Sequence, residues 1–230
     1  MVINTGTSRL SDPAPVKAQP RGEGGDGLWG DLTTFKRDRI LQEAALLFFE
    51  RGYLQTSMEA IAERLGASKP FIYSYFKSKV ALLVAICEMG TSEALAATVK
   101  AVSADGGPKQ RFEEFVRGFS SSVLKHHRLT AIYFREEINL PKEARDRINA
   151  MRKSIDHALR SLLSEGVESG DFELEDPQIS GLIIEGMSSY AFAWYRETGR
   201  LDQQKITDSI VKMTLKLVSV PVPPKKMINR

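Results

Sequence analysis

The hydrophobic positions of this chain recur at steps of three and four residues over most of its length, which is the periodicity of amphipathic helices. Alternation with period two is not sustained anywhere, and no internal repeat of roughly 20–50 residues is found. The first periodic stretch opens at Thr33 or Thr34, either of which offers a hydroxyl N-cap, and closes at Gly52. Its apolar face comprises Phe35, Ile40, Leu41, Ala44, Ala45, Leu47, Phe48 and Phe49. The pattern predicts an all-α protein of about nine helices.

Two short helices are predicted next, in residues 56–79. Thr56 and Ser57 offer an N-cap to the first of them, and Glu59 stands three residues after Thr56, as in a capping box. Ser68 caps the second, which carries Pro70 in its first turn, where proline costs little. Two short helices joined by a tight turn are typical of a helix-turn-helix, whose second helix lies in the DNA major groove.

Longer helices are predicted after this stretch. Ser78 caps one that runs to about residue 102, and the later ones are expected at 108–126, 129–139, 141–170, 176–198 and 202–219. Prolines at 221, 223 and 224 forbid further helix. The expected organisation is a helix-turn-helix domain at 32–79, a larger helical effector-binding and dimerisation domain at 80–219, and a flexible tail at 220–230.

Residues 1–31 are rich in Pro, Gly, Ser and Asp and carry few apolar residues, which predicts a disordered arm. The arm holds three cationic and four acidic side chains, so it is not expected to bind phosphates. The net charge of +3 and pI of about 8.9 permit nucleic-acid binding without requiring it. A single cysteine, Cys87, excludes an intrachain disulfide and favours a reducing compartment. With no apolar run near ~20 residues and no signal peptide, we expect a soluble cytoplasmic protein without membrane contact.

The second short helix has the chemistry of a DNA-reading element. Its first turns combine small, hydroxyl, cationic and phenolic side chains, which suit base edges and phosphates. Ser68, Lys69, Pro70, Phe71, Tyr73 and Tyr75 lie on it, and Lys79 follows at the start of the next helix. The alternative is a plain helical bundle whose aromatic residues are core, and for Ile72 and Phe76 that interpretation is preferred. Residues 32–79 contain eight Lys/Arg and five Asp/Glu, so charge supports DNA binding only modestly.

The same stretch resembles the DNA-binding signature of TetR-family transcriptional regulators over about 48 residues. The matching motifs are Gly52-Tyr53, Thr56-Ser57, Ile61-Ala62, Leu65-Gly66-Ala67-Ser68, Tyr73-Ser74-Tyr75-Phe76, Ser78-Lys79 and Leu82. The resemblance implies a homodimer that binds double-stranded operator DNA, and an effector domain that ends in two dimerising helices. It assigns phosphate or base contacts to Thr56, Lys69, Tyr73 and Lys79, and Thr34 and Ser57 complete the candidate set. Pro70 departs from the small residue common in the family at that place.

Ligand contacts are expected within the larger helical domain. Candidates are the apolar and aromatic residues Met89, Phe112, Phe115, Phe119, Ile132, Tyr133, Met187, Tyr190 and Trp194, whose spacing plain core packing would also produce. The segment 133–137, followed by Leu140 and Pro141, resembles the corresponding part of TetR-family regulators that respond to acyl-CoA thioesters. Arg135, held by the carboxylate of Glu136, is a candidate for an anionic ligand group, and a structural ion pair with Lys142 or Arg145 is the alternative.

The last two helices carry many apolar residues together with Gly181, Gly186, Ser188 and Ser189, which would let neighbouring helices approach closely. This surface fits an isologous dimer interface, and a single-chain core is the alternative.

Together these features predict a ligand-responsive repressor that leaves a near-palindromic operator when a small-molecule effector binds. Acyl-CoA thioesters of fatty-acid, steroid or aromatic-acid breakdown are the candidate effectors. The alternatives are a multidrug or solvent-sensing repressor of an efflux system, and a helical CoA-thioester-binding protein or enzyme without DNA binding. No catalytic constellation, metal-ligand spacing or cofactor motif is found, and Cys87 lies among apolar residues that favour an inert thiol.

Overall fold

The computed structural model describes the backbone of residues 26–219 and the side chains of residues 32–219. The arm expected before residue 26 and the tail expected at 220–230 lie outside the described residues. The chain divides into two compact units, Met1–Lys36 and Arg37–Arg230, with the boundary inside the first helix. The helix-turn-helix stretch and the larger helical body therefore share one unit.

Residues 26–219 contain helices and no strand, which confirms the all-α prediction for the described part of the chain. Nine of these α-helices have at least seven residues, and α9 (Ala191–Trp194) is a single short turn. The others are α1 (Asp26–Arg51), α2 (Met58–Arg64), α3 (Lys69–Tyr75), α4 (Lys79–Val102), α5 (Pro108–Lys125), α6 (His127–Glu136), the 3-10 helix η1 (Glu137–Asn139), α7 (Lys142–Ser169), α8 (Pro177–Ser189) and α10 (Gln203–Val218).

The start of α1 differs from the prediction. The helix begins at Asp26, so residues 26–31 belong to it and not to the arm, and neither Thr33 nor Thr34 is its N-cap. Extending an existing helix costs far less than nucleating one. Phe35, expected on the buried face, is 69% exposed. The far end is as predicted, because Gly52 follows α1 with φ of +88°, a conformation that glycine adopts without strain.

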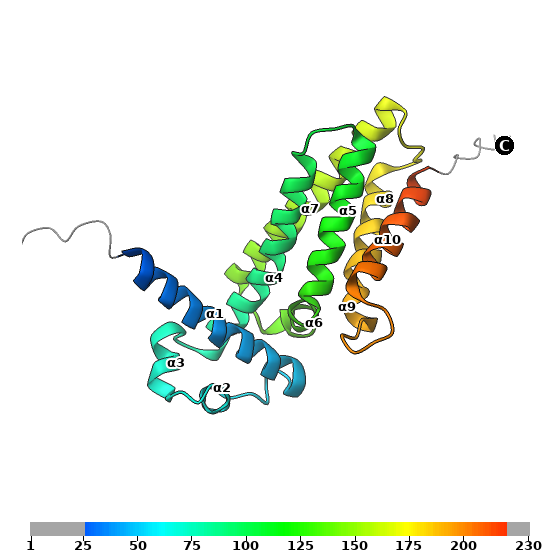
Figure 1. Ribbon diagram of the computed structural model, residues 1–230. Helices are drawn as coiled ribbons and strands as arrows, with labels where there is room; N and C mark the ends of the chain where they lie inside the picture. The colour runs from blue at the N-terminus through cyan, green and yellow to red at the C-terminus, as the bar shows by residue number, and fades with distance from the viewer. Residues whose placement is uncertain (1–25, 220–230) are drawn as a thin grey trace, which may run out of the picture. The chain divides into compact units, whose positions relative to one another are not determined.

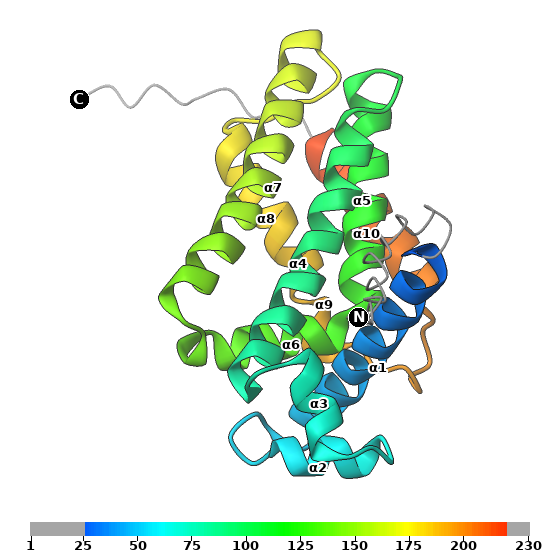
Figure 2. The same cartoon turned by 90° about the vertical axis from the view of Figure 1, so that its left-hand side faces the viewer.

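The first hydrophobic core joins the helix-turn-helix to the body. Residues of α1 from Ile40 onward, together with α2 and α3, pack against the first half of α4, α6 and the start of α7. Figures 1 and 2 both show α2 and α3 beside the N-terminal end of α4. Because Lys79 is the first residue of α4, the expected domain boundary after residue 79 coincides with the start of a helix that continues into the body.

The second core fills the body. It is built from the second half of α4 together with α5, α7, α8 and α10, with α5 packed against both α4 and α10. These helices lie side by side along the body in both views (Figures 1 and 2). Since α4 contributes Leu83 and Ile86 to the first core and Ala94 and Ala101 to the second, it is the helix common to both.

The helix expected at 176–198 is interrupted. α8 ends at Ser189, α9 follows, and the chain is extended at Tyr195. The interruption lets Ala191 and Tyr195 enter the second core, where both are buried, and this apolar burial offsets the lost helical hydrogen bonds.

An apolar surface remains on α8 and α10. The exposed large side chains there are Ile179, Leu182, Ile183, Met187, Met213 and Leu217. Gly181 and Ser188, by contrast, are buried against the body. Exposed apolar patches of this kind are typical of interaction surfaces.

α4 also has the length and composition of a membrane span, with a mean hydropathy of 1.6 over 18 residues, which the short apolar runs of the sequence did not indicate. Several of its residues, from Leu82 to Ala101, pack in the two cores described above. Core helices of globular proteins share these properties, and 28% of the residues in that window are buried inside the protein.

Candidate nucleic-acid interface and ligand cavity

The first turn of α3 is held by its N-cap and by buried side chains, and its outer side is exposed to solvent. Ser68 is the N-cap and its Oγ accepts a hydrogen bond from the Phe71 N–H at 3.4 Å. Ile72 is fully buried and Phe76 nearly so, as predicted for core positions. This packing leaves Lys69 and Pro70 exposed on the opposite face. The first turn of α3 can therefore approach a duplex without disturbing the core.

Lys69 and Tyr73 lie together on this face. The Lys69 ammonium pairs with the Glu59 carboxylate of α2 and lies 5.8 Å from the centre of the Tyr73 ring. The hydrogen bond from Lys69 lowers the pKa of Glu59, and the same bond raises the pKa of Lys69. Exposed pairs of this kind contribute little to stability, so a phosphate could replace Glu59 as the partner of Lys69 at small cost.

Thr56 does not belong to the exposed surface, in contrast to the prediction. Its side chain is 2% exposed, and its hydroxyl donates to the Gly52 carbonyl at 2.9 Å, with the Leu47 carbonyl at 3.3 Å. Ser57, and not Thr56, is the N-cap of α2, and its Oγ accepts from the Ala60 N–H. The capping box with Glu59 does not form, because Glu59 is the second residue of α2. Thr56 therefore stabilises the α1–α2 loop.

Lys79 was also expected to contact DNA, and the structure gives it an internal role. Its Nζ donates to the carbonyl oxygens of Thr56 (2.9 Å), Tyr53 (3.0 Å) and Leu54 (3.3 Å). The ammonium also lies 4.5 Å from the centre of the Tyr53 ring. All three ammonium hydrogens thus have a carbonyl partner, and Lys79 fastens the start of α4 to the loop before α2.

The remaining interface candidates are placed as follows. Ser57 is exposed beside the start of α2, and Phe71 and Tyr75 are half-buried, with ring centres 5.2 Å apart on α3. Thr34 lies within the other unit of the chain, so the structure does not place it relative to α3. Ser57, Ser68, Lys69 and Pro70 are thus exposed and Tyr73 is half-buried. Lys69 and Tyr73 are in contact with each other.

The body contains an inner cavity of about 60 Å³ that adjoins a wider outer groove of about 950 Å³. α4, α5, α6, α7 and α8 all contribute to the inner cavity, which is lined by Cys87, Gly90, Thr91, Ala94, Phe119, Val123, Leu129, Thr130, Tyr133, Phe134, Arg152, Ile155, Glu185 and Ser189. Phe134, Arg152, Glu185 and Ser189 line both spaces, and they form the throat between the two. An apolar chamber with a few polar groups at its mouth is typical of a small-molecule site.

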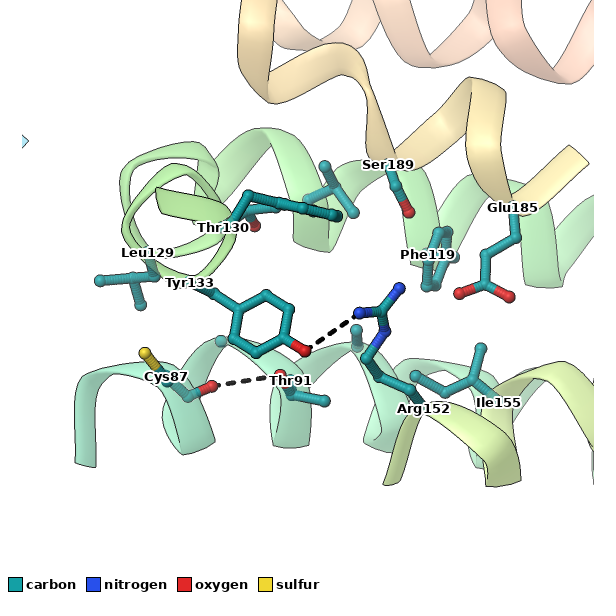
Figure 3. A pocket seen from close by; sticks show the side chains of 14 residues that line it. Cys87, Thr91, Phe119, Leu129, Thr130, Tyr133, Arg152, Ile155, Glu185 and Ser189 are labelled. Atoms are coloured by element: carbon teal, nitrogen blue, oxygen red, sulfur yellow. Dashed lines mark hydrogen bonds between the residues drawn. The ribbon is translucent and has the colours of Figure 1, made fainter. Parts of the chain in front are cut away.

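Arg152 is the central polar group of this throat. Its Nη1 donates to the Tyr133 hydroxyl at 3.1 Å, and its guanidinium stacks on the rings of Tyr133 and Phe134 at 5.4 and 5.6 Å. The Tyr133 hydroxyl in turn lies 3.1 Å from Glu137 Oε1 in η1. Figure 3 shows the guanidinium between the Tyr133 hydroxyl and the Glu185 carboxylate.

Glu185 faces the cavity from α8. Burial raises the pKa of its carboxyl and the nearby Asp156 carboxylate raises it further, whereas Arg152 acts in the opposite direction. No ion pair within 4.0 Å joins Glu185 to Arg152 in the described part of the chain. Glu185 is therefore a half-buried acid whose charge is only partly compensated.

Replacing Glu185 by glutamine should raise the melting temperature near pH 8 and have a smaller effect near pH 5. A carboxyl with a raised pKa binds more protons in the folded state than in the unfolded state, so its contribution to stability decreases as pH rises above 4.5. Glutamine removes that dependence. Thermal unfolding of both proteins across this pH range measures the difference, and an equal shift at pH 5 and pH 8 would contradict it.

Cys87 lines the inner cavity and should react very slowly with thiol reagents. Burial raises the pKa of this thiol from 9.0 to about 12, which lowers the thiolate fraction at neutral pH about a thousandfold. Because it is the only cysteine of the chain, reaction with a chromogenic disulfide reports on it directly. We expect slow reaction in the native protein and rapid reaction in denaturant, whereas rapid native reaction would indicate a cavity open to solvent.

The predicted ligand residues divide into three groups. Phe119 and Tyr133 line the inner cavity, and Tyr190 lines the outer groove. Phe112, Phe115 and Ile132 are fully buried core that lies behind these walls. The plain-core alternative is therefore correct for those three. Met89, Met187 and Trp194 line neither space, and Met187 and Trp194 are exposed instead.

Arg135 and Glu136 lie outside the cavity, in contrast to the prediction. The Arg135 guanidinium donates to the Phe49 carbonyl of α1 at 3.4 Å and lies over the Phe49 ring at 5.2 Å. Glu136 accepts a hydrogen bond from Asn139 at 2.8 Å. The alternative ion pair with the next helix does not form either, because Lys142 pairs with Asp146. Arg135 thus connects α6 to the end of α1.

Arg152 and Glu185 are the functional candidates that sequence reasoning missed. A signal exists in the spacing, because Arg152 follows Ile148 by four residues and precedes Ile155 by three, which puts it on the buried stripe of α7. Glu185 likewise follows Gly181 by four residues on the buried side of α8. Charged residues at core positions of a helical pattern would have identified both.

Among residues 32–219, no group of three or more His, Cys, Asp or Glu side chains is placed to hold a metal ion. His126 and His127 instead contact Glu93 and the Leu124 carbonyl.

Two family models match this chain. Residues 40–86 match the model described as bacterial regulatory proteins of the tetR family, and residues 105–218 match the model described as the tetracyclin repressor-like C-terminal domain. The first covers the second half of α1, α2, α3 and the start of α4, and the second covers α5 to α10. The residues of α2 and α3 that face outward thus lie within the first matched region. The cavity lining lies within the second, apart from the residues of α4, Cys87, Gly90, Thr91 and Ala94, which fall between the two.

Individual relatives agree with these models. The HTH-type transcriptional repressor KstR of Mycobacterium tuberculosis is 26% identical over 216 residues, which cover 92% of this chain and 96% of the relative. The structure of PfmR, a TetR family transcriptional regulator from Thermus thermophilus, has a TM-score of 0.73 at 29% identity and covers 78% of this chain and 98% of its own. The structure of AibR in complex with isovaleryl coenzyme A and operator DNA has a TM-score of 0.67 at 27% identity and covers 77% and 97%.

Proposed function

Because the chain belongs to the TetR family of transcriptional regulators, which are DNA-binding proteins and not enzymes, we propose that it is a ligand-responsive repressor acting as a homodimer. It binds a near-palindromic operator in the absence of effector and leaves it when a small molecule occupies the cavity. One observation carries this proposal. α4 starts beside α3, where Lys79 is bonded to the loop before α2, and eight residues later it begins to line the cavity with Cys87.

A second copy of the chain is the proposed partner for the exposed apolar face of α8 and α10. Isologous contact of two such faces would bury Leu182, Ile183 and Met213, which are about half exposed in the single chain. The two α3 helices would then reach successive major grooves, roughly 34 Å apart. Such a dimer acts on cytoplasmic DNA.

The proposed effector is an acyl-CoA thioester. The relative AibR was solved with isovaleryl coenzyme A, and the throat of this chain presents a cationic side chain, Arg152, to an acyl oxygen. A multidrug sensor is the second candidate, because three carboxylates, Asp146, Asp156 and Glu185, line the outer groove against two cations, Arg152 and Lys153. This acidic excess would attract cationic drugs. Release of DNA by acyl-CoAs alone supports the first candidate, and release by cationic drugs alone supports the second.

The DNA-binding assignment is tested by fluorescence anisotropy with DNA from upstream of the protein's own coding region. Lys69→Ala should weaken binding about tenfold and reduce the salt dependence by about one counterion, because it removes one phosphate partner. Tyr73→Phe should weaken binding by a smaller factor through loss of one hydroxyl. Glu59→Gln is the matched control, since it frees Lys69 and removes a negative charge, and it should strengthen binding. Unchanged binding in all three variants would contradict the assignment of this face.

A further inference from the structure

We propose that the effector of this protein carries a short acyl group, with two or three carbons beyond its carbonyl, and that the inner cavity sets this limit. The inference rests on the proposed ligand site and names the part of the ligand that the site selects. The carbonyl oxygen lies at Arg152, the short tail fills the inner cavity, and the uncharged pantetheine part of the thioester follows the outer groove.

The size of the inner cavity carries the first step. An engineered cavity of about 150 Å³ holds benzene, which corresponds to roughly 25 Å³ for each ring atom. At that ratio, the 60 Å³ of the inner cavity accommodates about two or three carbon atoms. A long fatty-acyl chain or a ring system exceeds this space several-fold. The outer groove, at about 950 Å³, imposes no such limit on the rest of the molecule.

The walls of the cavity carry the second step, because they resist widening. Phe119, Val123 and Ile155 are buried members of the second core, and Phe119 stacks on Phe115 with ring centres 5.6 Å apart. Close-packed interiors have little spare volume, so these side chains cannot retreat without displacing others. The inner cavity has no methionine in its lining, and methionine is the side chain that most readily adapts to ligands of different length.

The throat carries the third step, because it distinguishes a thioester from a free acid. Tyr133 is the hydrogen-bond partner of Arg152 among the described residues, so other N–H groups of the guanidinium can donate to an acyl oxygen. Glu185 and Asp156 face the same space. Repulsion by both acids would offset the attraction of Arg152 for a free carboxylate, whereas the neutral carbonyl of a thioester accepts from Arg152 without that repulsion. The site thus favours the thioester over the acid.

Calorimetric titration of the full-length protein without DNA tests this inference. The ligands are acetyl-, propionyl-, butyryl-, isobutyryl-, hexanoyl-, octanoyl- and palmitoyl-CoA, the matching pantetheine thioesters and the free acids. We expect the tightest binding for propionyl, butyryl and isobutyryl thioesters, and at least tenfold weaker binding for octanoyl and palmitoyl thioesters and for the free acids. Affinity that rises with chain length through palmitoyl, tighter binding of the acids, or absence of binding by any thioester would overturn it. Comparison of each pantetheine thioester with the matching CoA thioester shows whether the nucleotide part of CoA contributes to the affinity.

Cavity variants sharpen the test. Ile155→Ala removes three carbons from the wall and should move the optimum toward hexanoyl, and Ile155→Val should move it less in the same direction if the alanine variant does not fold. Ala94→Val narrows the cavity and should weaken butyryl-CoA at least tenfold relative to acetyl-CoA. Met89→Leu is the matched control, because Met89 lies on α4, as Ala94 does, but outside the inner cavity. It should leave the preference for acyl length unchanged. An unshifted optimum in both Ile155 variants would contradict the role of this wall.

The operator assay separates the two levels of the proposal. A protein that fails to bind operator yet prefers short thioesters refutes the regulatory function and retains the inferred ligand. A protein that binds operator and is released equally by short and long thioesters retains the regulatory function and refutes the inferred ligand.

Discussion

Lys79→Met should lower the free energy of unfolding by about 2–4 kcal/mol and weaken operator binding more than tenfold. Hydrogen bonds to charged groups contribute about 1.5–3 kcal/mol each, and Lys79 donates three of them, one of which is exposed and long. The cation–π contact with Tyr53 is lost as well. Methionine retains most of the aliphatic stem, so the change isolates the ammonium. Without it, the carbonyl oxygens of Leu54 and Thr56 lose this donor, whereas that of Tyr53 keeps a hydrogen bond from the Thr56 N–H at 3.2 Å.

Lys77→Met is the matched control for this prediction. Lys77 is two residues away and exposed, and its ammonium has one carbonyl contact at 3.4 Å, to Tyr73. Its replacement should change the stability by less than about 0.5 kcal/mol. Urea unfolding measures the stabilities, and anisotropy measures the affinities for operator. Equal stability of the two variants would show that Lys79 has no structural role. If Lys79→Met weakened DNA binding without loss of stability, the result would support a direct contact between Lys79 and DNA.

Gly166→Ala should destabilise the protein by about 3 kcal/mol, although alanine normally stabilises a helix relative to glycine by about 1 kcal/mol. Gly166 lies within α7 and is buried. A Cβ placed on it would approach the Phe172 ring to 2.0 Å, well inside van der Waals contact. The ring cannot move away freely, because it packs edge-to-face on Phe112 with centres 5.3 Å apart.

Gly118→Ala gives the opposite sign and serves as the control. Gly118 is also inside a helix, α5, and a Cβ there would meet the Ala97 Cβ at 3.5 Å, an ordinary contact. We expect a gain of about 0.5–1 kcal/mol from helix propensity. Urea unfolding of both variants therefore compares the same substitution with and without a steric conflict. Stabilisation of both would mean that Phe172 can be displaced at low cost.

Local signals predicted most of the fold because they act over a few residues. Ser57, Ser68 and Ser78 each cap the helix that follows them, and Gly52 and Gly170 end helices with positive φ. The interruption at Tyr190 could not be predicted in this way. It depends on burial of Ala191 and Tyr195 against distant helices, and no local propensity records that contact.

The sites were harder to predict because a residue type does not specify its partner. Lysines 69 and 79 are chemically equivalent in the sequence, yet one is exposed beside Glu59 and the other is bound to three carbonyls. Arg135 and Arg152 present the same ambiguity. Arg135 contacts Phe49, while Arg152 reaches the cavity from α7. Only the packing of helices far apart in the sequence decides which cation is available to a ligand.

The fastening of Lys79 has a mechanical consequence for α4. Gly90 lines the cavity eleven positions after Lys79, which at 1.5 Å per residue is a lever of about 17 Å. A tilt of about 10° around Gly90 would displace the start of α4 by about 3 Å. Because the ammonium ties that start to the loop before α2, the displacement would pass to the helix-turn-helix as a whole. In a symmetric dimer the two displacements would add. The separation of the two α3 helices would then no longer match the helical repeat of the duplex, which is about 34 Å.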